Sequence, residues 1–160
     1  MKRIFRYTFF ALILLIVIII GFLKINPPLA HGSIGTTEDK HTVIVALGNK
    51  SLLGSIHITD VSINNNQSTP NAKIQVSDSE KGFMLTDTYA LADDTYGMYD
   101  YETFSLDPDT SPMITKAIAS TVEKSPTTIY GLSITEDTSI DSINLTYRYF
   151  GLVFFTTIKV

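Results

Sequence analysis

Residues 107–111 have the types and the spacing of a cation site. Asp107, Asp109 and Ser111 form a D-x-D-x-S series, and hard oxygen ligands at alternate positions suit Ca²⁺. The series is not an EF-hand, because Pro112 stands where that loop needs glycine and Ile118 where it needs glutamate. Acidic residues just before a helix also cap its free N–H groups and favour its dipole. We therefore expect no cofactor and interpret these residues as helix caps, and a Ca²⁺ site formed by Asp107, Asp109 and Ser111 is the alternative.

The segment YALADDTYGMYDYE (89–102) is a candidate recognition surface, because it combines tyrosines with acidic residues. Tyrosine offers a large contact area at low entropic cost and is enriched in binding patches. We predict a ligand or partner surface formed by Tyr89, Tyr96, Tyr99 and Tyr101. The alternative is that these rings pack onto the domain as a minor core under the loop.

The sequence contains no motif that is typical of an enzyme. Cysteine is absent, which excludes disulfides, thiolate nucleophiles and thiolate metal sites. Ser55 and His57 are two residues apart, and on a strand this spacing separates them by about 6–7 Å, too far for a nucleophile–base hydrogen bond. No nucleophile elbow, zinc-protease pair, Walker loop or Rossmann glycine run occurs. We therefore predict a non-enzymatic protein. The alternative is a cell-envelope hydrolase that uses dispersed carboxylates, which leave no local signature.

An uninterrupted apolar segment near the N-terminus predicts insertion into a membrane. Residues 7–23 reach the lower end of the length of a spanning helix, roughly 17–25 residues, and Arg6 and Lys24 flank them. A signal peptide has a shorter apolar region and a small-x-small cleavage site. The best such site here has Pro28 two positions before Ala30, which is a poor match. We expect a retained single-pass anchor, and cleavage after Ala30 with secretion is the alternative.

The distribution of charge predicts the orientation and restricts the partners. Lys2, Arg3 and Arg6 precede the apolar segment and only Lys24 closely follows it, so the positive-inside rule places the N-terminus in the cytoplasm and the rest of the chain outside. The remaining chain carries eight basic and 16 acidic residues, a net charge of about −8. This charge opposes electrostatic binding to nucleic acid and to anionic lipid or wall polymers. Apart from the membrane, which residues 7–23 would enter, the expected partner is another cell-envelope protein or a small ligand.

Composition divides the chain into three parts. Residues 1–25 form a cytoplasmic tip and the transmembrane anchor. Residues 26–40 are rich in proline, glycine and small polar side chains without hydrophobic periodicity, and they predict a flexible tether. Residues 41–160 form the extracytoplasmic domain.

The domain is dominated by strand patterns. A phase slip near Thr59-Asp60 predicts a β-bulge, and Ser111-Pro112 begins one short helix that ends before Ser125-Pro126. We expect strands at 42–48, 55–63, 72–78, 82–87, 101–106 and 127–134, and a hairpin over 142–160 that turns at Phe150-Gly151. In its first strand, alternation predicts that Ile143, Leu145, Tyr147 and Tyr149 face the core and that Asn144, Thr146 and Arg148 face outward. This pattern predicts a mainly β fold, an antiparallel β-sandwich of immunoglobulin-like type with one short helix, preceded by an N-terminal transmembrane helix. A small β-barrel is the alternative for the domain.

The segments IYGLSI (129–134) and SINLTYRYFGLVFFTTIKV (142–160), with the anchor-plus-domain layout, resemble small membrane-anchored extracytoplasmic proteins of Bacillus-like Gram-positive bacteria. The resemblance implies an envelope with one membrane and carries no catalytic residue over. The sequence therefore predicts a membrane-anchored extracytoplasmic binding or interaction module.

Overall fold

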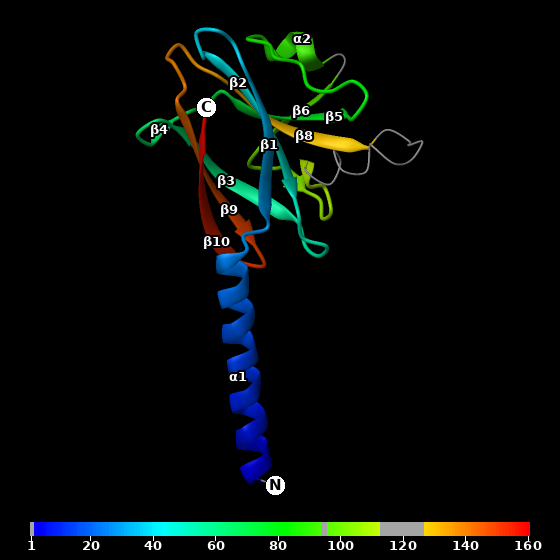
Figure 1. Cartoon of the computed structure of the whole chain (residues 1–160), viewed down its shortest axis with the longest axis vertical. Helices are drawn as coiled ribbons and strands as arrows, with labels where there is room; N and C mark the ends of the chain where they lie inside the picture. The colour runs from blue at the N-terminus through cyan, green and yellow to red at the C-terminus, as the bar shows by residue number, and fades with distance from the viewer. Residues whose placement is uncertain (1, 94–95, 113–126) are drawn as a thin grey trace.

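The computed structural model describes residues 2–93, 96–112 and 127–160, and it is mainly β (Figure 1). Two antiparallel sheets follow one N-terminal helix. In chain order the elements are α1 (Lys2–Ile25), β1 (Leu29–Thr36), β2 (Thr42–Asn49), β3 (Ile56–Ile63), β4 (Gln67–Ser68), β5 (Ala72–Asp78), α2 (Tyr89–Asp93), β6 (Gly97–Asp100), β7 (Ser105–Leu106), β8 (Thr128–Thr135), β9 (Ser142–Tyr149) and β10 (Leu152–Lys159).

Helix α1 extends away from one end of the β domain, and the C-terminus lies far from it (Figure 1). Its stretch Arg6–Ile25 contains 20 residues, none of which is buried, and it is long and apolar enough to cross a membrane. An apolar helix at this place in a chain fits a membrane anchor and a signal sequence alike. The structure therefore confirms the N-terminal apolar helix that the sequence predicts.

The first sheet, sheet A, has the strand order β1-β2-β8-β5-β6. All eight residues of its strand β2 are buried, which explains why this strand reads as a continuous apolar run without alternation. The loop after β7 covers the outer face near the end of β2, where the backbone N–H of Thr110 donates to the oxygen of Asn49 at 2.9 Å. A Cβ added at Gly48 would lie only 2.0 Å from the Thr110 oxygen, so this position requires glycine.

The second sheet, sheet B, has the strand order β10-β9-β3-β4, and β7 also pairs with β3. Strand β9 alternates as the sequence predicts, with Ile143, Leu145, Tyr147 and Tyr149 all buried. The predicted hairpin is confirmed, because β9 and β10 pair in continuous register from Leu152↔Tyr149 to Lys159↔Ser142.

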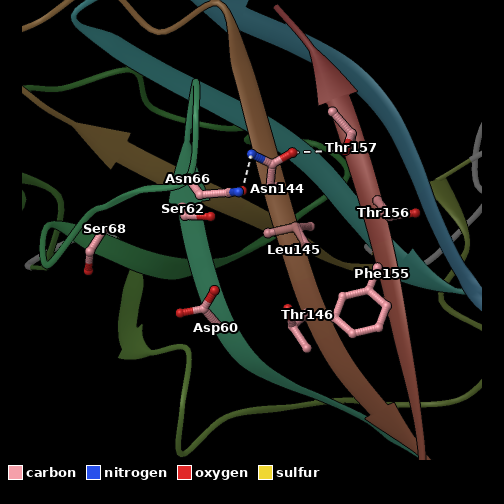
Figure 2. Close-up of a pocket in the computed structure, with 10 residues that line it drawn as sticks. All are labelled: Asp60, Ser62, Asn66, Ser68, Asn144, Leu145, Thr146, Phe155, Thr156 and Thr157. Carbon is pink, nitrogen blue, oxygen red and sulfur yellow. Dashed lines mark hydrogen bonds between the residues drawn. The ribbon is translucent and has the colours of Figure 1, made fainter.

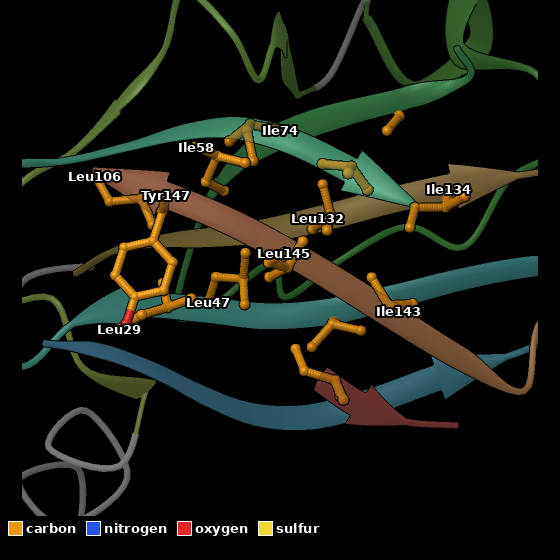
Figure 3. Close-up of a cluster of buried hydrophobic side chains, with 14 of the residues drawn as sticks. Leu29, Leu47, Ile58, Ile74, Leu106, Leu132, Ile134, Ile143, Leu145 and Tyr147 are labelled. Atoms are coloured by element: carbon orange, nitrogen blue, oxygen red, sulfur yellow. The ribbon is translucent and has the colours of Figure 1, made fainter. Parts of the chain in front are cut away.

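Side chains of both sheets meet in a single apolar core (Figure 3). Leu132 and Ile134 from sheet A, and Leu145 and Tyr147 from sheet B, are at most 1% exposed. The Tyr147 ring stacks on Phe154 of β10 at 5.3 Å between ring centres. Burial of this many large apolar side chains stabilises a domain that has no disulfide.

The phase slip in β3 is confirmed as an irregularity between Ile58 and Asp60 in its pairing with β9. Ile58 and Val61 point into the core although they are three residues apart, so Thr59 and Asp60 both lie on the exposed side. The bulge thereby places an acidic side chain on the outer face of sheet B.

The flexible tether predicted for residues 26–40 was wrong for residues 29–36, which form β1. This strand pairs with β2 from Leu29↔Asn49 to Thr36↔Val43, with an irregularity between His31 and Ile34. Leu29 is buried in the core. Backbone pairing with a long neighbouring strand stabilises β1 in spite of its weak composition, and that pairing is not visible in local sequence.

Two other predictions differ from the structure. Residues 82–87 form no strand. The side chain of Gln75 bonds to the backbone of this segment: its Oε1 accepts from the N–H of Met84 at 2.9 Å and its Nε2 donates to the Met84 oxygen at 3.3 Å. Within 101–106, only Ser105–Leu106 (β7) is a strand. The body of the expected helix after Pro112 lies outside the described residues.

Candidate functional site

A shallow groove runs across the outer face of sheet B (Figure 2). Its volume is about 400 Å³. Strands β3, β4, β9 and β10 and the turn between β3 and β4 supply its lining: Asp60, Ser62, Asn66, Ser68, Asn144, Leu145, Thr146, Phe155, Thr156 and Thr157. The lining is therefore made mostly of hydroxyl and amide side chains, with one carboxylate and one aromatic ring.

Strand register arranges these side chains in rows across the sheet. Asp60 lies opposite Thr146, which lies opposite Phe155. The next row consists of Ser62, Asn144 and Thr157. Directly opposite side chains on one face are about 4.5–5.5 Å apart at Cβ, so neighbouring rows form a dense array of hydrogen-bonding groups.

Asn144 holds the centre of this array in place. Its Nδ2 donates to the oxygen of Asn64 at 3.1 Å and to Oδ1 of Asn66 at 3.3 Å, and its Oδ1 accepts from Thr157 Oγ1 at 2.8 Å. These bonds connect β9, β10 and the turn after β3, and Figure 2 shows those to Asn66 and Thr157 as dashed lines. The polar floor of the groove is therefore preorganised, which lowers the entropic cost of binding a ligand.

Phe155 is 76% exposed, and its ring stands free beside Thr146 (Figure 2). Strand β10 is an edge of sheet B, so among the described strands none lies on the far side of the ring. Across the groove, Asp60 is exposed, and within the described residues its carboxylate accepts no hydrogen bond. An apolar ring and a free acceptor thus face the same groove from opposite sides.

The four predicted tyrosines do not form one surface. Tyr89 is partly buried, and its hydroxyl donates to the backbone oxygens of Asn71 and Ser133 at 2.5 and 3.1 Å. Burial raises the pKa of Tyr89. Tyr101 packs against the core, and burial also raises its pKa. Tyr89 and Tyr101 therefore fit the alternative interpretation, in which the rings pack onto the domain as a minor core under the loop.

Tyr99 is the exposed member of the group, at 48%. Its ring lies 5.2 Å from Phe104, which makes an edge-to-face contact with Tyr130 at 5.4 Å. Tyr96 is partly buried, and its N–H donates to the oxygen of Ala92. Tyr99 is therefore the one exposed ring of the four. A role for Tyr99 in binding a partner stays a prediction.

The three candidate calcium ligands differ in their surroundings. Asp107 accepts a hydrogen bond from the Tyr130 hydroxyl at 3.2 Å, and burial together with the charge of Asp107 raises the pKa of Tyr130 to about 12. Asp109 adopts a left-handed backbone and donates its N–H to the Ser51 oxygen, and Ser111 is buried. Within the described part of the chain, no three acidic or histidine side chains converge as a metal site.

His57 pairs with a serine that sequence spacing did not indicate. Its Nδ1 lies 3.1 Å from the Oγ of Ser105, because β7 pairs with β3 beside it. His57 is exposed, and in the described ranges the hydrogen-bond partner of its ring is the Ser105 hydroxyl and not a carboxylate. Within the described residues the pair therefore has no carboxylate to orient the base, as a catalytic triad has.

The groove itself was missed from the sequence. Alternation in residues 142–149 indicates that Asn144 and Thr146 face outward, so the contribution of β9 to the groove could be predicted. The contributions of β3 and β10 depend on strand order, which local sequence does not specify. A scan with protein-family models, a search of curated proteins and a search of solved structures each found no match to this chain.

Proposed function

We propose that this protein is a membrane-anchored extracytoplasmic binding module without catalytic activity, and that the groove on sheet B is its ligand surface. The observation that carries the proposal is the preorganised array around Asn144 next to the exposed ring of Phe155. Binding sites typically combine an apolar contact with a few polar groups that fix the ligand's orientation.

The chemistry of the groove favours a neutral, hydroxyl-rich ligand, that is, a carbohydrate chain of the envelope. Hydroxyl and amide groups donate to and accept from sugar hydroxyls, and the face of Phe155 offers a surface for the C–H side of a sugar ring. Asp60 and the negative charge of the domain oppose anionic polymers. A hydrolase would need a pair of carboxylates, whereas Asp60 is the one carboxylate among the lining residues described.

Two structural features support a retained anchor over cleavage after Ala30. Such a cut would remove Leu29, which is buried in the core. It would also remove Pro28, whose oxygen accepts from the N–H of Lys50 at 2.9 Å. We further propose that the N-terminus is cytoplasmic, as the basic residues before α1 indicate, and that the two sheets form a sandwich of immunoglobulin-like type.

The test uses the full chain in phospholipid nanodiscs, titrated with chitohexaose and cellohexaose as neutral probes by calorimetry. We expect saturable binding of at least one probe, and we expect Phe155→Ala to weaken it at least about tenfold, because the substitution removes the stacking surface. Val153→Ala is the matched control, since Val153 is an exposed apolar residue on the same strand that does not line the groove. Equal loss in both variants, or no binding of either probe, would contradict the proposal.

A further inference from the structure

The end of the domain next to α1 carries three large apolar side chains in exposed positions. Leu52 and Leu53, in the loop between β2 and β3, are 75% and 71% exposed, and Phe150, in the turn between β9 and β10, is 65% exposed. Both connections lie at the end of the domain from which the helix emerges (Figure 1). We call Leu52, Leu53 and Phe150 the apolar tip.

The two connections form one unit. The Tyr149 hydroxyl lies 2.6 Å from the Ser51 Oγ and donates to the Leu53 oxygen at 2.5 Å. The Phe150 ring lies on Gly54, where an added Cβ would be 2.8 Å from its Cζ. The apolar tip is therefore presented by a bonded pair of loops and not by free chain.

The backbone of Phe150 is unusual for its residue type. Phe150 and Gly151 have φ angles of 46° and 75°, and a two-residue hairpin of type I′ requires positive φ at both positions. Asparagine, aspartate or glycine suit the first position, whereas a bulky residue there is strained. The Phe150 ring makes an edge-to-face contact with Tyr149 at 4.6 Å between ring centres, yet Phe150 remains 65% exposed. A bulky, exposed residue kept at a strained turn points to a role for the uncovered part of its ring.

The position of the anchor indicates what the apolar tip contacts. Arg6–Ile25 contains 20 residues, which span about 30 Å, the thickness of the hydrocarbon core of a bilayer. Phe22, Leu23 and Asn26 line a small cavity together with Lys50 and Ser51. The loop that carries Leu52 and Leu53 thus begins beside the last turn of the helix, at the depth where the span reaches the outer membrane surface.

We propose that the apolar tip inserts into the outer leaflet of the membrane and seats the domain on the bilayer. Apolar side chains partition into the headgroup and acyl boundary, and Lys50, exposed next to the tip, can extend to the headgroups. The seated domain holds the groove of sheet B at a set height above the membrane. This inference rests on the proposed retention of α1 as an anchor.

The chain contains no tryptophan, so single-tryptophan variants report the depth of one position each. Full-length Leu53→Trp and Phe150→Trp are placed in nanodiscs whose lipids carry bromine near the headgroup end of the acyl chains. We expect at least about twofold loss of fluorescence for both, as for side chains at the acyl boundary. Thr138→Trp, at an exposed position in the loop between β8 and β9 at the opposite end, should lose none.

Phe22→Trp within α1 separates the two proposals. Quenching of Phe22→Trp without quenching of either tip variant would overturn the insertion of the tip and leave the anchor intact. Absence of quenching at Phe22→Trp would overturn the anchor and the insertion together. If Phe150→Trp does not fold, Leu53→Trp alone decides, because Leu53 lies outside the strained turn.

Discussion

The ammonium group of Lys24, at the end of α1, lies 4.4 Å from the centre of the Phe154 ring in β10 and donates a hydrogen bond to the Val153 oxygen. Phe154 is 4% exposed and stacks on Tyr147 in the core. The helix therefore connects to the β domain through specific contacts and not only through the chain.

Lys24→Gln should loosen this junction. Cation–π contacts contribute about 0.5–2 kcal/mol, so we expect faster hydrogen exchange of the Lys50 amide, which donates to Pro28 beside the junction. Hydrogen–deuterium exchange of the full chain in nanodiscs measures it. Lys159→Gln, at the other end of β10, serves as the control and should not change that exchange. An unchanged rate in Lys24→Gln would mean that the contact does not stabilise the junction.

Leu145→Ala should lower the free energy of unfolding by about 2–5 kcal/mol, because it leaves a cavity in the core. Leu145 is 1% exposed, whereas Arg148 on the same strand is exposed. Arg148→Ala should change stability by less than about 0.5 kcal/mol. Chemical denaturation of the full chain in detergent micelles, followed by near-ultraviolet circular dichroism, compares the two. Equal losses would contradict the register of β9.

Tyr147→Phe and Tyr130→Phe should differ in their effects on stability. The Tyr147 hydroxyl is buried and makes no hydrogen bond of good geometry to any described residue, so its removal should leave stability unchanged or raise it by up to about 1 kcal/mol. Tyr130 donates to Asp107, and losing that bond should cost about 0.5–1.5 kcal/mol. The same denaturation experiment tests both variants. A large loss in Tyr147→Phe would show that its hydroxyl is bonded in the folded protein.

Stability should fall in alkaline solution. Burial raises the pKa of Tyr130 and of Tyr147 to about 12, whereas an unfolded tyrosine titrates near about 10. Between these values the folded state retains protons that the unfolded state releases, so the free energy of unfolding decreases as the pH rises from about 10 to about 12. Unfolding curves over this range should show a weaker decrease in each Tyr→Phe variant. A pH dependence identical to that of the wild type would contradict the raised pKa of the substituted tyrosine.

Millimolar Ca²⁺ should leave the melting temperature of the protein unchanged. Asp107 already accepts from Tyr130, and Ser111 is buried, so the D-x-D-x-S series does not present a set of free oxygen ligands. Thermal unfolding with Ca²⁺ and with EDTA compares the two states. A rise of several degrees that is lost in Asp107→Asn with Asp109→Asn would show that calcium binds the folded state.

Local sequence was sufficient where a strand or helix carries its own periodicity. The apolar helix, the hairpin of β9 and β10 and the irregularity at Thr59-Asp60 were all predicted, because burial of one face imposes a period of two on a strand and leaves a detectable slip at a bulge. The continuous apolar run of β2 was likewise recognised as a strand from its β-branched residues.

Strand β1, the pairing of His57 with Ser105 and the groove around Asn144 were not predicted. Each depends on which strands become neighbours, and neighbours are selected by core packing over long separations in the chain. Leu29 enters the core only because β2 accepts β1 at its edge. Phe155 and Asp60 lie in one row across sheet B only because β9 pairs with both of their strands. Side-chain alternation specifies the face of a strand, and the assembled sheet determines what stands beside it on that face.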